Sequence, residues 1–167
     1  MMTILPAVET DISTLAPLVN AAYRGEGGWT GEAHLIAGNR TDEAGIAELM
    51  NQPHAVILVY KDETGETTGC VYLQKQGHTL YLGLLSVRPD QQAKGIGKKL
   101  LAAADQYAVE QGCPRISITV ISARTELLVW YERHGYARTG ESKPFHAGEK
   151  FGIQKEPLQL LLLEKNV

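Results

Sequence analysis

The stretch that decides this fold reads SVRPDQQAKGIGKKLLAAADQYAVEQG and covers residues 86–112. It follows an apolar run, residues 80–87, that is rich in strand-forming side chains. Pro89 ends this strand, because proline has no N–H to give to a ladder. From Gly95 onward, apolar residues recur every three or four positions, which is typical of one helix face, and Gly112 ends the pattern. The apolar positions are Ile96, Leu100, Ala103, Ala104, Tyr107 and Ala108.

A strand, a glycine-containing turn and a helix in this order can form an anion site. The first N–H groups of a helix lack intrahelical acceptors and, with the helix dipole, attract negative charge. Gly95 and Gly97 leave room for a diphosphate at the backbone, and Lys94, Lys98 and Lys99 add positive charge. An ordinary strand-to-helix turn with solvated lysines is the alternative reading of the same residues.

Composition narrows the class of protein. The chain has 167 residues, 44% hydrophobic and 21% charged, which is typical of a globular domain with a substantial core. A net charge of −3 argues against nucleic acid as the main partner. Cys70 and Cys113 indicate neither a disulfide framework nor a metal site. Because there is no signal peptide and no bilayer-length apolar run, we expect a cytoplasmic protein without a membrane partner.

The pattern along the chain predicts one α/β (α+β) domain over residues 1–167. We expect helices at residues 11–24, 41–50, 95–112 and 123–134. We expect strands at residues 3–8, 54–60, 67–75, 79–87, 115–120, 136–141 and 158–164. This order predicts a mixed, mostly antiparallel sheet flanked by helices. The last strand suits either the centre of the sheet or a homodimer interface.

Two motifs make the sequence resemble the GNAT N-acetyltransferase superfamily. The family's [RQ]-x-x-G-x-[GA] signature, which follows a V-x-P strand end, reads Gln92-Ala-Lys-Gly95-Ile-Gly97 after Val87-Arg-Pro89. A family helix ending Y-x-x-x-G-[FY] is matched by Tyr131-Glu-Arg-His-Gly135-Tyr136. The order of elements fits the family over about residues 3–165.

The resemblance implies acetyl-CoA as co-substrate and no metal. It implies that the backbone of the glycine turn and Lys98 hold the diphosphate, while the strand end pairs with the pantetheine arm and polarises the thioester carbonyl. The implied CoA-binding residues are Leu85, Ser86, Val87, Gln92, Ala93, Lys94, Gly95, Ile96, Gly97, Lys98 and Arg124.

The resemblance further implies that an amine attacks the thioester directly, through a tetrahedral intermediate. Tyr131 would be the general acid that protonates the departing thiolate, since a phenol with a pKa near 10 is protonated at neutral pH. The chain departs from the family at Arg124, where many members carry asparagine, and it lacks an acid on the strand of residues 79–87. The candidate bases are Glu26, Glu32, His146 or a water held by Ser117 or Thr119.

Acceptor choice in this family lies in the first loop–helix region and in the late loop. The candidate acceptor residues are Trp29, Glu32, Phe145 and His146. An aromatic wall with carboxylates would suit a cationic amine, whereas Arg24 and Arg40 would suit an acceptor that also bears a carboxylate. We expect the amine of a small molecule, with a peptide N-terminus or protein lysine as the alternative.

Two other classes of function remain open from the sequence. Arg124 and the missing strand acid would fit a catalytically idle acyl-CoA-binding regulatory module. A nucleotide-binding α/β protein is disfavoured, because Leu100 stands where a dinucleotide motif needs its third glycine.

Overall fold

The computed structural model describes residues 3–24, 36–37, 40–144, 153–154 and 158–167 of the chain. Four α-helices lie in these residues: α1 (Ile12–Arg24), α2 (Glu43–Met50), α3 (Ile96–Glu110) and α4 (Thr125–Arg133). The main sheet contains β1 (Thr3–Pro6), β3 (Ala55–Lys61), β4 (Thr67–Gln76), β5 (Thr79–Val87), β6 (Arg115–Ile121), β7 (Ala137–Pro144) and β9 (Gln159–Asn166).

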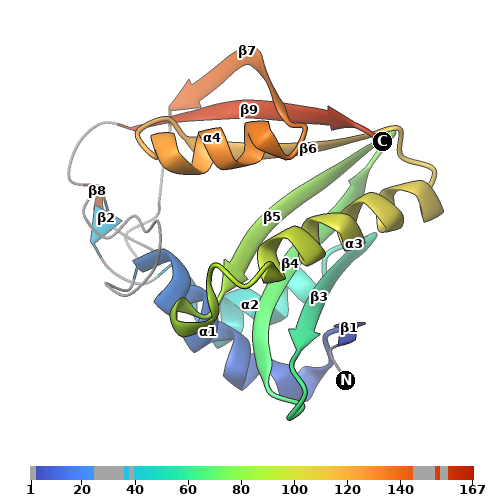
Figure 1. Ribbon diagram of the computed structural model, residues 1–167, viewed down its shortest axis with the longest axis vertical. Helices are drawn as coiled ribbons and strands as arrows, with labels where there is room; N and C mark the ends of the chain where they lie inside the picture. The colour runs from blue at the N-terminus through green and yellow to red at the C-terminus, as the bar shows by residue number, and fades with distance from the viewer. Residues whose placement is uncertain (1–2, 25–35, 38–39, 145–152, 155–157) are drawn as a thin grey trace.

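The strands of the main sheet follow the order β1-β3-β4-β5-β6-β9-β7 (Figure 1). Every neighbouring pair is antiparallel except β5 and β6, which run parallel. The predicted α/β class, with a mixed, mostly antiparallel sheet flanked by helices, is therefore confirmed.

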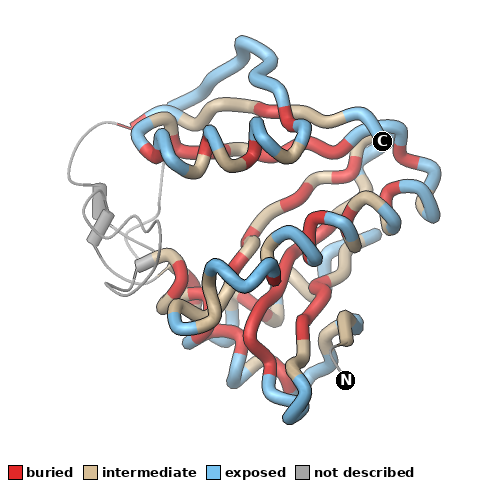
Figure 2. Tube along the Cα trace, viewed as in Figure 1, coloured by how far each residue is buried: buried red, intermediate tan, exposed pale blue. Residues whose placement is uncertain are grey.

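The helices cover both faces of the sheet, and each pair of helices packs on its own core. One core joins α3 and α4 to the sheet through Leu100, Leu128 and Leu163, which are almost fully buried. The other core joins α1 and α2 to the opposite face through Leu15 and Ile46. Figure 2 shows that buried residues concentrate on the middle strands and on the inward faces of the helices.

β5 contributes buried residues to both cores. Its burial alternates along the strand, with Leu80, Leu82, Leu84 and Ser86 buried between half-buried neighbours. Residues two positions apart in a strand point to the same face. Leu80 and Leu82 nevertheless belong to the core of α3 and α4, whereas Leu84 belongs to that of α1 and α2, so the strand changes face between Leu82 and Leu84.

The last strand resolves one open point of the sequence analysis. β9 lies inside the sheet, with β6 on one side and β7 on the other. Its apolar residues are thus used within the chain, as shown by the full burial of Leu163.

The sequence placed the long elements well and missed the shortest ones. The strand at residues 79–87 is as predicted, and the other long elements differ by a few residues at their ends. Two short strands, β2 (Ile36–Ala37) and β8 (Ile153–Gln154), pair with each other in a separate sheet. Two residues are too few to produce a periodic pattern, so these strands could not be predicted from the sequence.

Candidate functional site

The site is built where β5 and β6 separate. The two parallel strands pair only at Thr79–Arg115, Leu80–Ile116 and Tyr81–Ser117. Beyond these pairs the strands diverge, as Figure 1 shows, although each keeps its antiparallel neighbour on the other side. A splay of this kind leaves backbone N–H and C=O groups along β5 that can bind a ligand.

A β-bulge shapes the diverging half of β5. The register with β4 shifts between Cys70–Ser86 and Tyr72–Gly83, so β5 carries one extra residue there. Leu84, at the bulge, has a φ of 56°, which is rare for a leucine. The Ser86 hydroxyl donates a hydrogen bond to the Leu84 carbonyl at 3.0 Å, and the Cys70 thiol donates to the same oxygen at 3.7 Å. These two bonds give the buried Leu84 carbonyl its hydrogen-bond partners. Bulges are common next to functional sites, where they change the direction of a strand.

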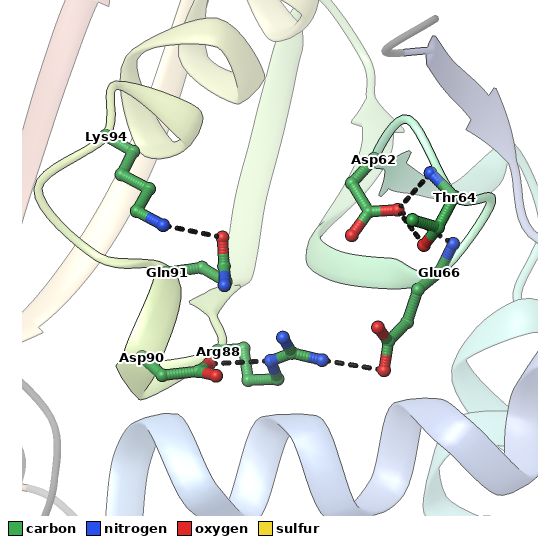
Figure 3. Close-up of polar contacts among 7 residues, drawn as sticks. All are labelled: Asp62, Thr64, Glu66, Arg88, Asp90, Gln91 and Lys94. Atoms are coloured by element: carbon green, nitrogen blue, oxygen red, sulfur yellow. Dashed lines mark hydrogen bonds and ion pairs between the residues drawn. The ribbon is translucent and has the colours of Figure 1, made fainter.

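The turn after β5 is fixed by a cluster of ion pairs (Figure 3). The Arg88 guanidinium lies 2.6 Å from the Asp90 carboxylate and 2.7 Å from that of Glu66 in the β3–β4 hairpin. The hydrogen bond from Arg88 holds the pKa of Asp90 below its usual value. The Gln92 amide also donates to the Val87 carbonyl at 3.1 Å. The turn is thus tied both to the neighbouring hairpin and to the end of β5.

The start of α3 has a backbone conformation that suits the predicted anion site. Ala93 has a φ of 65° and Gly95 a φ of 82°, and Gly95 is the N-cap residue of the helix. Left-handed backbone at these positions turns successive N–H groups toward one side, which is how anion-binding concavities form. Gln92, Ala93, Gly95, Gly97 and Lys98 line a cavity of about 180 Å³. These residues fit a diphosphate.

Gly97 allows α3 and α4 to approach each other closely. A Cβ on Gly97 would stand only 3.2 Å from Cζ2 of Trp130, a residue of α4. Trp130 itself lines the cavity and packs against the Tyr131 ring, with the two centroids 5.1 Å apart. The second glycine of the signature is therefore needed for the contact with α4 as well as for the turn.

Tyr131 lies on α4 and faces the interior, with only 5% of its surface exposed. Gly135, with a φ of 95°, ends the helix, and the Tyr136 N–H then donates to the Tyr131 carbonyl at 3.1 Å. Burial, reinforced by Tyr23 and Tyr136, raises the pKa of the Tyr131 phenol well above its ordinary value. Its hydroxyl is therefore protonated throughout the neutral range, as a general acid must be before the reaction.

A second cavity, of about 270 Å³, is lined by β5 and β6 where the two strands have separated. The two cavities have four lining residues in common, which are Tyr23, Arg124, Leu127 and Tyr131. From β5 and β6 the second cavity adds Tyr81, Gly83 and Thr119, and from elsewhere it adds Arg40 and Lys143. Tyr131 is thus at a junction that can be reached from both cavities.

Tyr23 and two arginines form a cluster at this junction. The Arg124 guanidinium carbon lies 5.4 Å from the centroid of the Tyr23 ring, and that of Arg40 lies 5.3 Å from it. Arg124 is 8% exposed and is the N-cap residue of α4. The residue at which this sequence departs from the family pattern is therefore buried between the cavities.

Most of the predicted CoA-binding residues are brought together. Leu85, Val87, Gln92, Ala93, Gly95, Ile96, Gly97, Lys98 and Arg124 all line the first cavity. Ser86 is buried and is not among the lining residues of this cavity. Lys94 is not among the lining residues, because its amine turns back to the Gln91 side chain at 3.2 Å (Figure 3).

The predicted acceptor residues belong to parts of the chain that the structure does not describe. Trp29, Glu32, Phe145 and His146 lie outside the described residues, as does the candidate base Glu26. Of the two hydroxyl residues suggested to hold a water, Thr119 lines the second cavity. Ser117 instead belongs to the last paired position of β5 and β6.

Several further residues line the two cavities and were not predicted from the sequence. Leu127 could have been found from its spacing to Tyr131 on the predicted helix, since residues four apart lie on the same face. Trp130 could not, because adjacent helix positions point in different directions. Tyr81 could have been found from the alternation of β5, because it shares a face with Gly83, two residues further along the strand. A Cβ on Gly83 would stand 3.0 Å from the Tyr81 hydroxyl, so the glycine makes room for that phenol. Lys143 gave no signal, because its strand is exposed throughout.

Among the described residues, no three side chains of His, Cys, Asp or Glu come together in a way that could hold a metal ion. None of the helices in the described part of the chain is both long enough and apolar enough to cross a bilayer.

Comparison with known proteins agrees with this geometry. An acetyltransferase of Agrobacterium fabrum is 33% identical over 97 residues, covering 56% of this chain and 66% of that protein. A mycothiol acetyltransferase of Clavibacter sepedonicus is 31% identical over 91 residues, covering 54% of this chain and 30% of that protein. The chain therefore matches only part of the length of these relatives.

The fold is also that of solved acetyltransferases. An N-acetyltransferase of Thermoplasma acidophilum, solved in complex with coenzyme A, superposes with a TM-score of 0.74 at 14% identity, over 100% of this chain and 99% of that one. The model of the Acetyltransferase (GNAT) family matches residues 18–136, which include the glycine turn, the β5–β6 splay and Tyr131. The chain therefore belongs to the GNAT acetyltransferase family, as the two motifs predicted.

Proposed function

We propose that this protein, as one domain over residues 1–167, transfers an acetyl group from acetyl-CoA to the primary amine of a small metabolite. The observation that carries the proposal is the meeting of two cavities at Tyr131. A bisubstrate transfer needs two ligands that enter separately and touch at one point, and this arrangement supplies that point.

The first cavity suits the donor. Its glycine turn and Lys98 supply N–H groups and a cation for a diphosphate, and its apolar residues Leu85, Val87 and Leu127 suit the pantetheine arm. Because β5 has no strand partner beyond Tyr81 on the β6 side, its backbone can pair with the amides of that arm. An N–H of the bulged segment directed at the thioester oxygen would stabilise the oxyanion, a contribution of about 3–4 kcal/mol in comparable sites.

The chemistry then needs one bond made, one broken and two proton movements. The neutral amine attacks the thioester carbon to form the C–N bond, and the C–S bond breaks as the tetrahedral intermediate collapses. Tyr131 gives its phenolic proton to the departing thiolate, and the amine nitrogen loses a proton to water. Its raised pKa keeps the Tyr131 phenol protonated at the start of each turnover.

The proton from the amine can leave through the second cavity. Thr119 lines this cavity and can hold a water beside the attacking nitrogen. No carboxylate is among the described residues of that cavity, so we assign the proton to a held water.

Ligand binding and turnover test the proposal together. Acetyl-CoA should raise the melting temperature, whereas ATP and NAD should not, because only a ligand that binds the folded state stabilises it. CoA release should then be measured over a panel of small amines and a panel of peptides with free N-termini. Release with small amines supports the proposal. Release with peptides alone would assign a peptide acetyltransferase, and acetyl-CoA binding without any release would assign a regulatory module.

A further inference from the structure

We propose that the acceptor carries a carboxylate in addition to its amine, and that Arg40 and Lys143 recognise this carboxylate in the second cavity. This inference rests on the proposed acetyl transfer and names the class of its acceptor, a small amino acid or a close derivative.

The charge of the second cavity is the first observation. Its described lining residues include three cations, Arg40, Arg124 and Lys143, and none of those described residues is Asp or Glu. A cationic amine with no anionic group would be repelled by such a surface, whereas a carboxylate would be attracted to it. The cavity therefore favours an acceptor with a negative group.

The cations differ in the cavities that they line. Arg124 lines both cavities together with Tyr131, so it lies at the junction where the reaction would occur. Arg40 and Lys143 line only the second cavity, and the Arg40 guanidinium lies over the ring of Tyr23, a residue of the junction. The carboxylate of a small amino acid is two bonds from its amine, so an acceptor with its amine at Tyr131 would have its carboxylate within the part of the cavity that these cations line.

Arg40 is held in place before any ligand arrives. The Asn20 side-chain oxygen accepts hydrogen bonds from the Arg40 N–H at 2.7 Å and from the Thr41 N–H at 2.9 Å. The Arg40 guanidinium lies over the Tyr23 ring. A planar guanidinium fixed in this way can bind both oxygens of a carboxylate with little loss of side-chain entropy.

Lys143 comes from the other side of the cavity and from a distant part of the sequence. It lies on β7 opposite Leu160 of β9, which is also a lining residue. Its long and exposed side chain supplies a mobile point charge, complementary to the fixed fork of Arg40.

The test compares acceptors that differ only in the carboxylate. CoA release is measured with the twenty amino acids, with their C-terminal amides and with the corresponding decarboxylated amines. At least one amino acid should be acetylated with a kcat/KM about tenfold or more above those of its amide and its decarboxylated amine. The opposite order, or equal rates within each set, would overturn the inference.

Variants then connect the preference to the two residues. Arg40→Gln and Lys143→Gln should each raise the KM of the amino acid about tenfold, a much larger change than in the KM of its amide, and leave the KM of acetyl-CoA unchanged. Arg138→Gln is the matched control, because it removes a cation from β7, the strand that also carries Lys143. Arg138 pairs with Glu132, and neither residue lines either cavity. An equal effect of all three variants would show a general field effect and would contradict the assignment.

A binding measurement separates this inference from the proposed function. Calorimetric titration of the CoA-loaded protein with N-acetyl amino acids and with their amides does not depend on turnover. Tighter binding of the acids, lost in Arg40→Gln, supports the carboxylate site even if no acceptor releases CoA. Turnover of amides and simple amines at undiminished rates, with no preference for acids in binding, would leave the transferase intact and remove the carboxylate site.

Discussion

The Trp130 ring lies against Gly97, so that a Cβ on Gly97 would stand 3.2 Å from Cζ2 of the ring. This contact joins the two motifs of the sequence, since Gly97 belongs to the glycine turn and Trp130 precedes Tyr131 on α4. The donor site and the proposed acid are therefore positioned by the same packing. Trp130 also packs against His134, with the ring centroids 4.4 Å apart, which limits how far the indole can move.

Gly97→Ala should weaken acetyl-CoA binding without destabilising the protein. Alanine inside a helix favours folding by about 0.5–1 kcal/mol relative to glycine. The new Cβ, however, displaces Trp130 toward the cavity that it lines, and moving the ring back when CoA binds should cost about 1.4 kcal/mol, which is about a tenfold loss of affinity. Calorimetric titration with CoA and urea unfolding would measure the two effects.

Gly95→Ala should differ from Gly97→Ala in its effect on stability. A Cβ at Gly95 meets nothing within 4 Å, but the residue has a φ of 82°. Alanine in this left-handed conformation should lower the free energy of unfolding by about 1–2 kcal/mol. An equal loss of stability in both variants would contradict this division of roles.

Cys70 should make the protein less stable in alkaline solution. Burial raises the pKa of the Cys70 thiol to about 12, from an ordinary value of 9.0. The folded state thus holds the proton more tightly, so this stability is complete below pH 9 and is lost progressively between pH 9 and pH 12. At pH 10.5 the loss would approach about 2 kcal/mol.

Urea unfolding from pH 8 to pH 11 checks this expectation. Cys70→Ala should be less stable at pH 8, because it leaves a cavity and removes the thiol bond to Leu84. Its stability should nevertheless fall less steeply with pH than that of the wild type. Parallel curves for the two proteins would show that Cys70 does not carry the effect.

Asn20→Ala should affect the acceptor and leave the donor unchanged. Asn20 holds the segment before α2 by three hydrogen bonds, including one from its amide to the Thr41 carbonyl at 2.9 Å. Because Thr41 is buried, the loss of these partners should cost about 1–3 kcal/mol of stability. We expect a higher KM for the acceptor, through displacement of Arg40, with an unchanged KM for acetyl-CoA.

Asn51→Ala is the control for this variant, since Asn51 is exposed at the end of α2. It should change neither stability nor either KM by more than experimental error. A similar rise in the KM of acetyl-CoA in Asn20→Ala would contradict the separation of the two cavities.

The sequence predicted the lining residues of the first cavity far better than those of the second. The glycine turn and the tyrosine helix are local patterns, in which spacing along the chain determines spacing in the structure. The fold class followed from the same periodicity. The bulge at Leu84 could not be predicted, because it depends on the register between β4 and β5 and changes no residue type.

The acceptor cavity depends on contacts between residues far apart in the chain. Arg40 and Lys143 line one cavity although about a hundred residues separate them, and no local pattern relates them. Arg124 was recognised as a departure from the family, but only the structure shows it buried beside Tyr23. Residues brought together by a sheet crossover are the ones that sequence reasoning finds least well.

The junction of the two cavities at Tyr131 is the central claim, and Tyr131→Phe tests it most directly. The substitution keeps the ring that packs against Trp130 and Tyr136 and removes the phenolic proton. Loss of a general acid should lower kcat by about 10²- to 10⁴-fold. Tyr107→Phe, on α3 and outside both cavities, is the control and should keep its full rate.

The decisive measurement is kcat for CoA release by wild type and Tyr131→Phe with one acceptor at saturation, beside the acetyl-CoA dissociation constant of each. The account predicts a fall in kcat of at least about a hundredfold, with acetyl-CoA affinity unchanged. A kcat equal to that of the wild type would contradict it.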